Sequence, residues 1–116
     1  MNLYTNELYM EDVRYVSALN LPWKKFQDKS LMLSGATGMI GSFLVDVILE
    51  RNLVNGLNCT VYALGRNEQK ARERFEKYDG DQHLIFIQYD VKEPFQRDDL
   101  GKTDYVLHLA SNTHPM

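Results

Sequence analysis

The chain has 116 residues, of which 44% are hydrophobic and 25% are charged, and its net charge is −3. This length predicts one domain with a modest core. The scattered Lys and Arg residues, outnumbered by acidic ones, argue against a nucleic-acid-binding face. No apolar run approaches the roughly 20 residues that span a bilayer, and the N-terminus does not resemble a signal peptide. A lone cysteine, Cys59, predicts no disulfide or metal cluster and favours a reducing, cytoplasmic compartment, with Cys59 itself a small buried apolar residue.

The first 29 residues form a leader before the first strand, and residues 6–20 are predicted to be helical. Asn6 is suited to cap this helix, and Pro22 prevents its easy continuation. The apolar positions at helical spacing are Leu8, Val13, Val16 and Leu19. We expect the leader to cover an edge or an end of the sheet. The alternative is a contact with a second subunit, as in a homodimer, or with a domain outside this sequence.

Strands alternate with helices over residues 30–116, which predicts a doubly wound, parallel, right-handed α/β sheet. The expected strands are residues 30–34, 59–65, 84–88 and 104–110. The first of them is a nearly continuous apolar run, as expected for a strand covered by helices on both faces. A parallel sheet normally continues beyond a fourth strand, so we expect this chain to be the front part of a longer polypeptide.

Two helices are expected between these strands, over residues 39–51 and 68–78. The first is expected to bury Ile40, Phe43, Leu44, Val47 and Ile48. Asn55-Gly56 follows it as a stop signal. In the second helix Ala71 and Phe75 form an apolar pair, and its many charged side chains are interpreted as a solvated face.

The most informative motif is Gly35-Ala-Thr-Gly38-Met-Ile-Gly41, which lies between the first strand and the first helix of the sheet. The first glycine permits a tight turn, and the second lets the backbone approach a phosphate. The third lets the helix pack closely on the strand. Unpaired N–H groups of the first helical turn then face the anion. This arrangement predicts a dinucleotide site.

The end of the second strand bears on which dinucleotide is bound. An acidic residue at this place binds the adenosine ribose of NAD, whereas an arginine accommodates the 2′-phosphate of NADP. Here Gly65-Arg66-Asn67 follows the strand, and the next carboxylate is Glu68. A guanidinium group is planar and permanently charged, which suits phosphate. We therefore expect NADP, with NAD as the alternative if Arg66 is only a surface residue.

Two further segments follow predicted strands at their carboxyl ends, where a ligand is expected to lie. Asp90 follows the third strand and could accept a hydrogen bond from the adenine amino group or simply cap a loop. Ala110 and Ser111 follow the fourth strand, and their small side chains would let the backbone pass close to a cofactor. His108 lies within that strand and is interpreted as a core histidine.

At these residues the chain resembles the short-chain dehydrogenase/reductase superfamily, and within it the extended branch of nucleotide-sugar epimerases and dehydratases. The matching stretches are Gly35–Gly41, Asp90-Val91 and His108-Leu-Ala-Ser111. The resemblance covers about residues 30–116, the cofactor half of that fold. The expected cofactor-binding residues are Gly35, Thr37, Gly38, Met39, Ile40, Gly41, Arg66, Asn67, Asp90, Val91, Leu109, Ala110 and Ser111.

The resemblance implies reversible hydride transfer between a nicotinamide and a carbon of a nucleotide sugar. In the family a tyrosine, with a lysine four residues later, acts as the general base. This sequence contains no Tyr-x-x-x-Lys pattern, so no catalytic residue is assigned, and no metal ligand either. The alternative is a non-catalytic, NADP-sensing regulator, which the downstream absence of that pair would support. A flavin- or methyl-donor-binding domain fits the glycine spacing less well.

Overall fold

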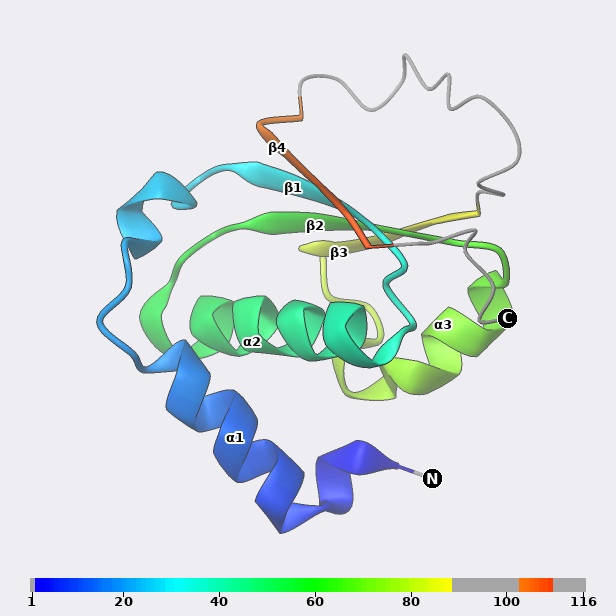
Figure 1. Cartoon of the computed structure of the whole chain (residues 1–116), viewed down its shortest axis with the longest axis horizontal. Coiled ribbons are helices and arrows are strands. Elements are labelled where there is room, and N and C mark those ends of the chain that lie inside the picture. The colour runs from blue at the N-terminus through cyan, green and yellow to red at the C-terminus, as the bar shows by residue number, and fades with distance from the viewer. Residues whose placement is uncertain (1, 89–102, 110–116) are drawn as a thin grey trace, which may run out of the picture.

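The computed structural model describes residues 2–88 and 103–109, which form a parallel sheet with helices packed on it (Figure 1). The strands are β1 (Ser30–Ser34), β2 (Thr60–Gly65), β3 (Leu84–Gln88) and β4 (Tyr105–His108). The α-helices are α1 (Glu7–Ser17), α2 (Met39–Asn55) and α3 (Glu68–Arg74), and the 3-10 helices are η1 (Leu3–Thr5), η2 (Trp23–Lys25) and η3 (Glu76–Tyr78). The predicted α/β organisation is confirmed.

The strands lie in the order β3-β2-β1-β4, and every neighbouring pair is parallel. The chain moves outward from β1 to β2 and β3, and then returns to the other side of β1 to form β4. The direction of winding therefore reverses between β1 and β4. In open α/β sheets, ligands bind beyond the carboxyl ends of the strands at such a reversal. We call this end of the sheet, where Ser34, Gly65 and His108 end their strands, the carboxyl edge.

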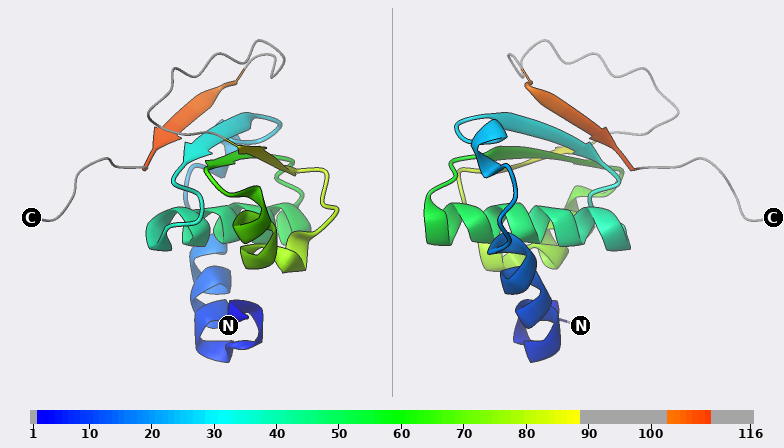
Figure 2. Two further views of the ribbon diagram at one scale, coloured as in Figure 1. Left: turned by 90° about the vertical axis from the view of Figure 1, so that its right-hand side faces the viewer. Right: turned by 60° about the vertical axis from the view of Figure 1, so that its left-hand side comes forward.

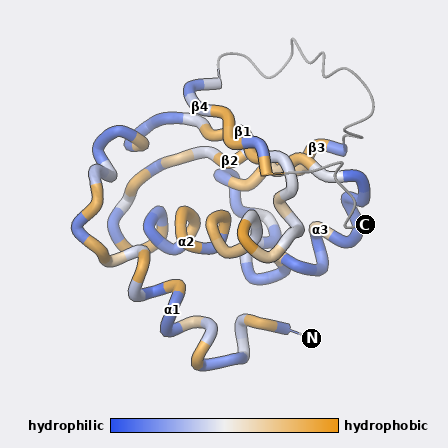
Figure 3. The backbone as a smooth tube through the Cα atoms, in the orientation of Figure 1, coloured by the Kyte–Doolittle hydropathy of each residue, from blue (hydrophilic) through white to orange (hydrophobic). Residues whose placement is uncertain are grey.

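All α-helices of the described residues lie on one side of the sheet (Figure 2). On that face the core joins the inward side chains of the strands to α2 and α3, and it includes Leu33, Val45, Leu49, Val61 and Phe75. The opposite face has its own apolar cluster, formed by Met32, Leu64 and Ile87. β1 contributes buried residues to both faces, and its sequence is therefore a nearly continuous apolar run (Figure 3). The expected crossover between β3 and β4 lies outside the described residues.

Local signals set the ends of the helices. The Asn6 side chain caps α1 by accepting a hydrogen bond from the Tyr9 N–H at 3.1 Å, as predicted. Gly56 ends α2 in the left-handed conformation at φ +65°. The predicted helix over 68–78 is shorter than expected, since α3 ends at Arg74 and a 3-10 turn follows. Ala71, Phe75 and Cys59 are buried, as predicted.

The predicted burial of Ile40 is wrong, and Leu8, one of the apolar positions at helical spacing, is also exposed. Leu8 is 75% exposed, and α1 buries Met10 and Val13 instead. Ile40 is 66% exposed, whereas Gly41 and Ser42, which follow it in the first turn of α2, are buried. In both cases the helix is present as predicted, but the side chain faces solvent and not the core.

The leader packs mainly on α2, as a further layer outside the helices that cover the sheet (Figures 1 and 2). Met10 and Val13 of α1 form an apolar cluster with Val47 of α2. After α1, Trp23 and Phe26 pack near Leu31 at the start of β1. The leader thus reaches an end of the sheet, as expected, but its helix lies against α2 rather than along a sheet edge. Among the described residues, no helix has the length and apolar character needed to cross a membrane.

Candidate functional site: the carboxyl edge and the start of helix α2

The turn between β1 and α2 has the shape that its glycines predict. Gly35 adopts φ +72°, a conformation that residues with a side chain rarely take. Its carbonyl oxygen accepts a hydrogen bond from the Gly38 N–H at 3.1 Å, and α2 begins at Met39. The chain therefore reverses tightly at the end of β1 and enters the helix at the carboxyl edge.

Gly41 lets α2 press against this turn. A Cβ atom at Gly41 would lie 2.2 Å from the Gly35 carbonyl oxygen and 3.2 Å from the Ala36 Cα, both of which are backbone atoms. At Gly38 a Cβ would lie 3.3 Å from the same oxygen, which is tight but not prohibitive. The structure thus gives Gly41 the close-packing role, and it leaves Gly38 as a bare backbone surface.

The first turn of α2 offers unused hydrogen-bond donors. Within the described residues, the N–H groups of Met39, Ile40 and Gly41 have no acceptor, as expected for the start of a helix. The Met39 side chain is 89% exposed, so the entrance to this turn is open. We call these three N–H groups the phosphate cradle. They lie at the positive end of the helix dipole, and this arrangement binds anions. Thr37, half-buried, precedes the cradle.

The end of β2 lies beside this turn, because Ser34 and Leu64 are paired in the register of β1 and β2. Arg66 is exposed and forms no hydrogen bond or ion pair within the described part of the chain. A Cβ at Gly65 would have no neighbour within 4 Å. The Asn67 side chain caps α3 by accepting from the Lys70 N–H at 3.0 Å, a structural role that the sequence analysis did not assign.

The end of β4 forms the other side of the reversal. The Leu109 N–H donates to the Ser34 carbonyl oxygen at 3.2 Å and to Ser34 Oγ at 3.1 Å. His108 is exposed, so the prediction of a core histidine is wrong: its side chain lies on the sheet face opposite α2, and its Nδ1 lies 2.7 Å from Ser34 Oγ. The predicted site residues Asp90, Val91, Ala110 and Ser111 lie outside the described residues.

Comparison with known proteins identifies the family. Residues 31–116 match the sequence profile of the NAD dependent epimerase/dehydratase family. The chain belongs to this family. It is also 35% identical, over 83 residues, to a protein of Mycobacterium tuberculosis named carboxylic acid reductase; the match covers 70% of this chain and 7% of that protein.

A solved structure supports the fold. The protein Pen from Bacillus thuringiensis superposes with a TM-score of 0.60 at 22% identity, over 77% of this chain and 27% of that one. The chain thus spans less than a third of either protein. Membership of the epimerase/dehydratase family implies an NAD(P)-binding oxidoreductase domain with a nicotinamide dinucleotide as cofactor. The open phosphate cradle and the backbone left bare at Gly38 fit the pyrophosphate of such a cofactor.

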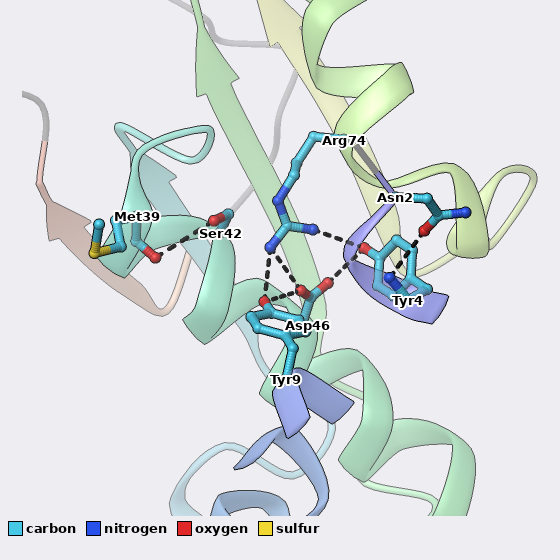
Figure 4. Close-up of polar contacts among 7 residues, drawn as sticks. All are labelled: Asn2, Tyr4, Tyr9, Met39, Ser42, Asp46 and Arg74. Atoms are coloured by element: carbon cyan, nitrogen blue, oxygen red, sulfur yellow. Dashed lines mark hydrogen bonds and ion pairs between the residues drawn. The ribbon is translucent and has the colours of Figure 1, made fainter. Parts of the chain in front are cut away.

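Behind the cradle, this family member contains a buried ionic network that the sequence analysis missed (Figure 4). Asp46 of α2 is fully buried and forms an ion pair of 2.9 Å with Arg74 of α3. Tyr4 donates its hydroxyl to Asp46 Oδ1 at 2.7 Å, and Tyr9 donates to Oδ2. Arg74 in turn donates to the hydroxyl oxygens of Tyr4 and Tyr9, at 3.0 and 2.7 Å. The network therefore ties the leader to both helices.

This network corrects the interpretation of α3 as a solvated charged helix. Arg74 is only 16% exposed on its side chain, whereas Arg72 on the same helix is exposed and pairs with Glu68 at 3.2 Å. Burial lowers the pKa of Arg74, but the charge of Asp46 and their hydrogen bond outweigh it, so the net shift is upward. In the sequence, the signal for this network was Asp46, because a carboxylate inside an otherwise apolar helix segment requires a partner.

The network predicts a loss of stability at high pH. Burial, together with the hydrogen bond and negative charge of Asp46, raises the pKa of Tyr9 from 10.0 to about 12. Because the folded state holds the proton more tightly, this stabilisation is complete below pH 10 and is lost as the pH rises toward about 12. Urea unfolding across this range should show a decline in the free energy of unfolding that is smaller in Tyr9→Phe. Replacement of the exposed Tyr15 by Phe, on the same helix, should leave the decline unchanged.

Proposed function

We propose that this domain binds NADP in preference to NAD, with the pyrophosphate at the phosphate cradle. The observation that carries the proposal is the open first turn of α2, whose three N–H groups lack acceptors within the described residues. It lies at the point where the strand order reverses, which is where dinucleotides bind in such sheets. When bound, the nicotinamide supplies hydride transfer. The residues of this chain would hold the pyrophosphate and the adenosine end of the cofactor.

Arg66 supports the preference for NADP. It is exposed at the end of β2 and has no partner among the described residues, so its guanidinium is available to a 2′-phosphate. The strand end carries no acidic residue for the ribose of NAD, and the next carboxylate, Glu68, is paired with Arg72. The open space above Gly65 leaves room for the adenosine.

For the whole protein we propose hydride transfer at a carbon of a nucleotide sugar, followed by epimerisation or dehydration. The membership of the epimerase/dehydratase family supports this reaction class. The sequence has no tyrosine followed four residues later by lysine, so the role of this chain is to hold the cofactor. The buried thiol of Cys59, with no second cysteine in the sequence, supports a reducing, cytoplasmic environment.

A second candidate is a reductase, and the 35% identity to carboxylic acid reductase favours it. The two reactions differ in their use of the cofactor. An epimerase or dehydratase returns the hydride and consumes no net cofactor, whereas a reductase oxidises one NADPH for each product molecule. The two reactions can be distinguished by the absorbance of the nicotinamide while the whole protein turns over nucleotide sugars or activated carboxylic acids. Stoichiometric loss of NADPH supports the reductase.

The cofactor preference can be tested by calorimetry with NADP⁺ and NAD⁺. We expect Arg66→Ala to weaken NADP⁺ binding by roughly ten- to a hundredfold, the effect of losing charge-assisted hydrogen bonds, and to leave NAD⁺ binding nearly unchanged. Arg14→Ala removes the same charge from α1, far from the carboxyl edge, and should change neither affinity. Equal or tighter binding of NAD⁺ by the unaltered chain would refute the preference for NADP.

A further inference from the structure

Ser34 and His108 form a side-chain link between β1 and β4 at the reversal of the strand order. They are paired in the register of the two strands, and Ser34 Oγ lies 2.7 Å from His108 Nδ1. Ser34 directly precedes Gly35, the first residue of the glycine turn. His108 directly precedes Leu109, with which the chain leaves β4. The link therefore joins the ends of β1 and β4 at the reversal of the strand order, where the cofactor site is proposed.

The burial of Ser34 calls for an explanation. It ends a strand whose preceding residues, Leu31, Met32 and Leu33, are apolar, and it is only 6% exposed. A buried hydroxyl costs free energy unless it is hydrogen-bonded. Here the oxygen accepts the Leu109 N–H and also contacts the imidazole of His108, so one hydroxyl binds both the side chain and the main chain at the end of β4.

We propose that Ser34 and His108 are positioning residues that set the separation between the glycine turn and the end of β4 at Leu109. This inference rests on the proposed cofactor site at the carboxyl edge. At the end of β4 the Leu109 N–H also donates to the Ser34 carbonyl and to Ser34 Oγ. Together with the contact between the two side chains, these bonds limit how far the two strand ends separate. Holding them at a fixed separation preorganises the crevice, which favours binding.

The test compares NADP⁺ affinity, measured by calorimetry, with stability, measured by urea unfolding. We expect Ser34→Ala and His108→Leu each to raise the Kd about five- to tenfold, in the range of one lost hydrogen bond. His108→Asn places a polar atom near the position of Nδ1 and should restore most of the affinity. The double variant should bind no more weakly than Ser34→Ala alone, because Ser34→Ala already removes the contact with His108 together with the bond from the Leu109 N–H.

Ser17→Ala is the matched control. Ser17 is likewise 6% exposed and hydrogen-bonded, to the Arg14 carbonyl, but it lies on α1. This variant should keep the affinity of the unaltered chain. If the folded Ser34→Ala and His108→Leu variants bind NADP⁺ as tightly as the unaltered chain, or if His108→Asn binds as weakly as His108→Leu, the positioning role is refuted while the cofactor site stands. If the unaltered chain binds neither NADP⁺ nor NAD⁺, the proposed function is refuted, and this inference with it.

Discussion

Replacement of Asp46 by alanine is expected to lower the free energy of unfolding by about 3–5 kcal/mol, as for other broken buried ion pairs. The change leaves the Arg74 guanidinium in a pocket where its side chain is only 16% exposed. It also removes the acceptor of the Tyr4 and Tyr9 hydroxyls. Since small domains are stable by about 5–15 kcal/mol, this loss is a large part of the total.

Urea unfolding measures the loss, and Asp46→Asn provides a milder variant should the alanine variant not fold. The amide can still accept one hydroxyl, so we expect an intermediate loss of stability. The control is Glu7→Gln, which breaks an exposed ion pair with Arg14 on the same leader helix and should have little effect. Equal effects of Asp46→Asn and Glu7→Gln would show that the buried network does not stabilise the fold.

The double replacement of Asp46 and Arg74 is informative in its own right. Leucine at both positions removes the two charges together, so no unpaired charge remains buried. We expect the double variant to lose less stability than the sum of the two single changes. If the double variant lost as much stability as the two single variants together, Asp46 and Arg74 would act independently, which would contradict the contact of 2.9 Å between them.

Gly41→Ala is expected to weaken NADP⁺ binding by at least about tenfold and to lower the free energy of unfolding by about 2 kcal/mol, a typical cost of overpacking. The new Cβ would meet the Gly35 carbonyl oxygen at 2.2 Å, and neither partner can yield without moving the backbone. The helix must shift away from the turn, and the phosphate cradle moves with it. Calorimetry with NADP⁺ and urea unfolding would measure the two effects.

Two other glycines serve as controls for this change. Gly65→Ala has open space around its new Cβ, so its stability should stay close to that of the unaltered chain. Gly38→Ala meets the Gly35 oxygen at 3.3 Å, so we expect a small loss of stability and a clear loss of affinity, because the methyl group occupies the surface proposed for phosphate. If Gly41→Ala were as stable as Gly65→Ala and bound NADP⁺ as tightly as the unaltered chain, the packing argument would fail.

The parts of this protein that the sequence predicted are those set by neighbouring residues. The bounds of β1 and β3 follow from short apolar runs, the start of α1 follows from Asn6, and the end of α2 follows from Gly56. The turn at Gly35 belongs to the same class, since its left-handed backbone depends on the residue itself. Hydrogen bonds and steric limits within a few residues decide all of these features, so the sequence carries the information directly.

The faces that the helices bury could not be predicted in the same way. α2 is covered by the sheet on one side and by α1 on the other, so its apolar residues do not mark a single inward face. For α1, which side chains are buried depends on how the helix crosses α2, and this placed Met10 inside and Leu8 outside. Such choices depend on the partner surface, which is distant in sequence.

By itself, the sequence determined the parallel α/β fold, the glycine turn and the type of ligand for which that turn is suited, because each depends on local backbone geometry and on hydrophobic pattern. Only the tertiary structure decided which polar residues meet. It paired Asp46 with Arg74, 28 residues further along, and Ser34 with His108, 74 residues further along. Burial makes an unpaired polar group costly, but the fold alone brings its partner within reach.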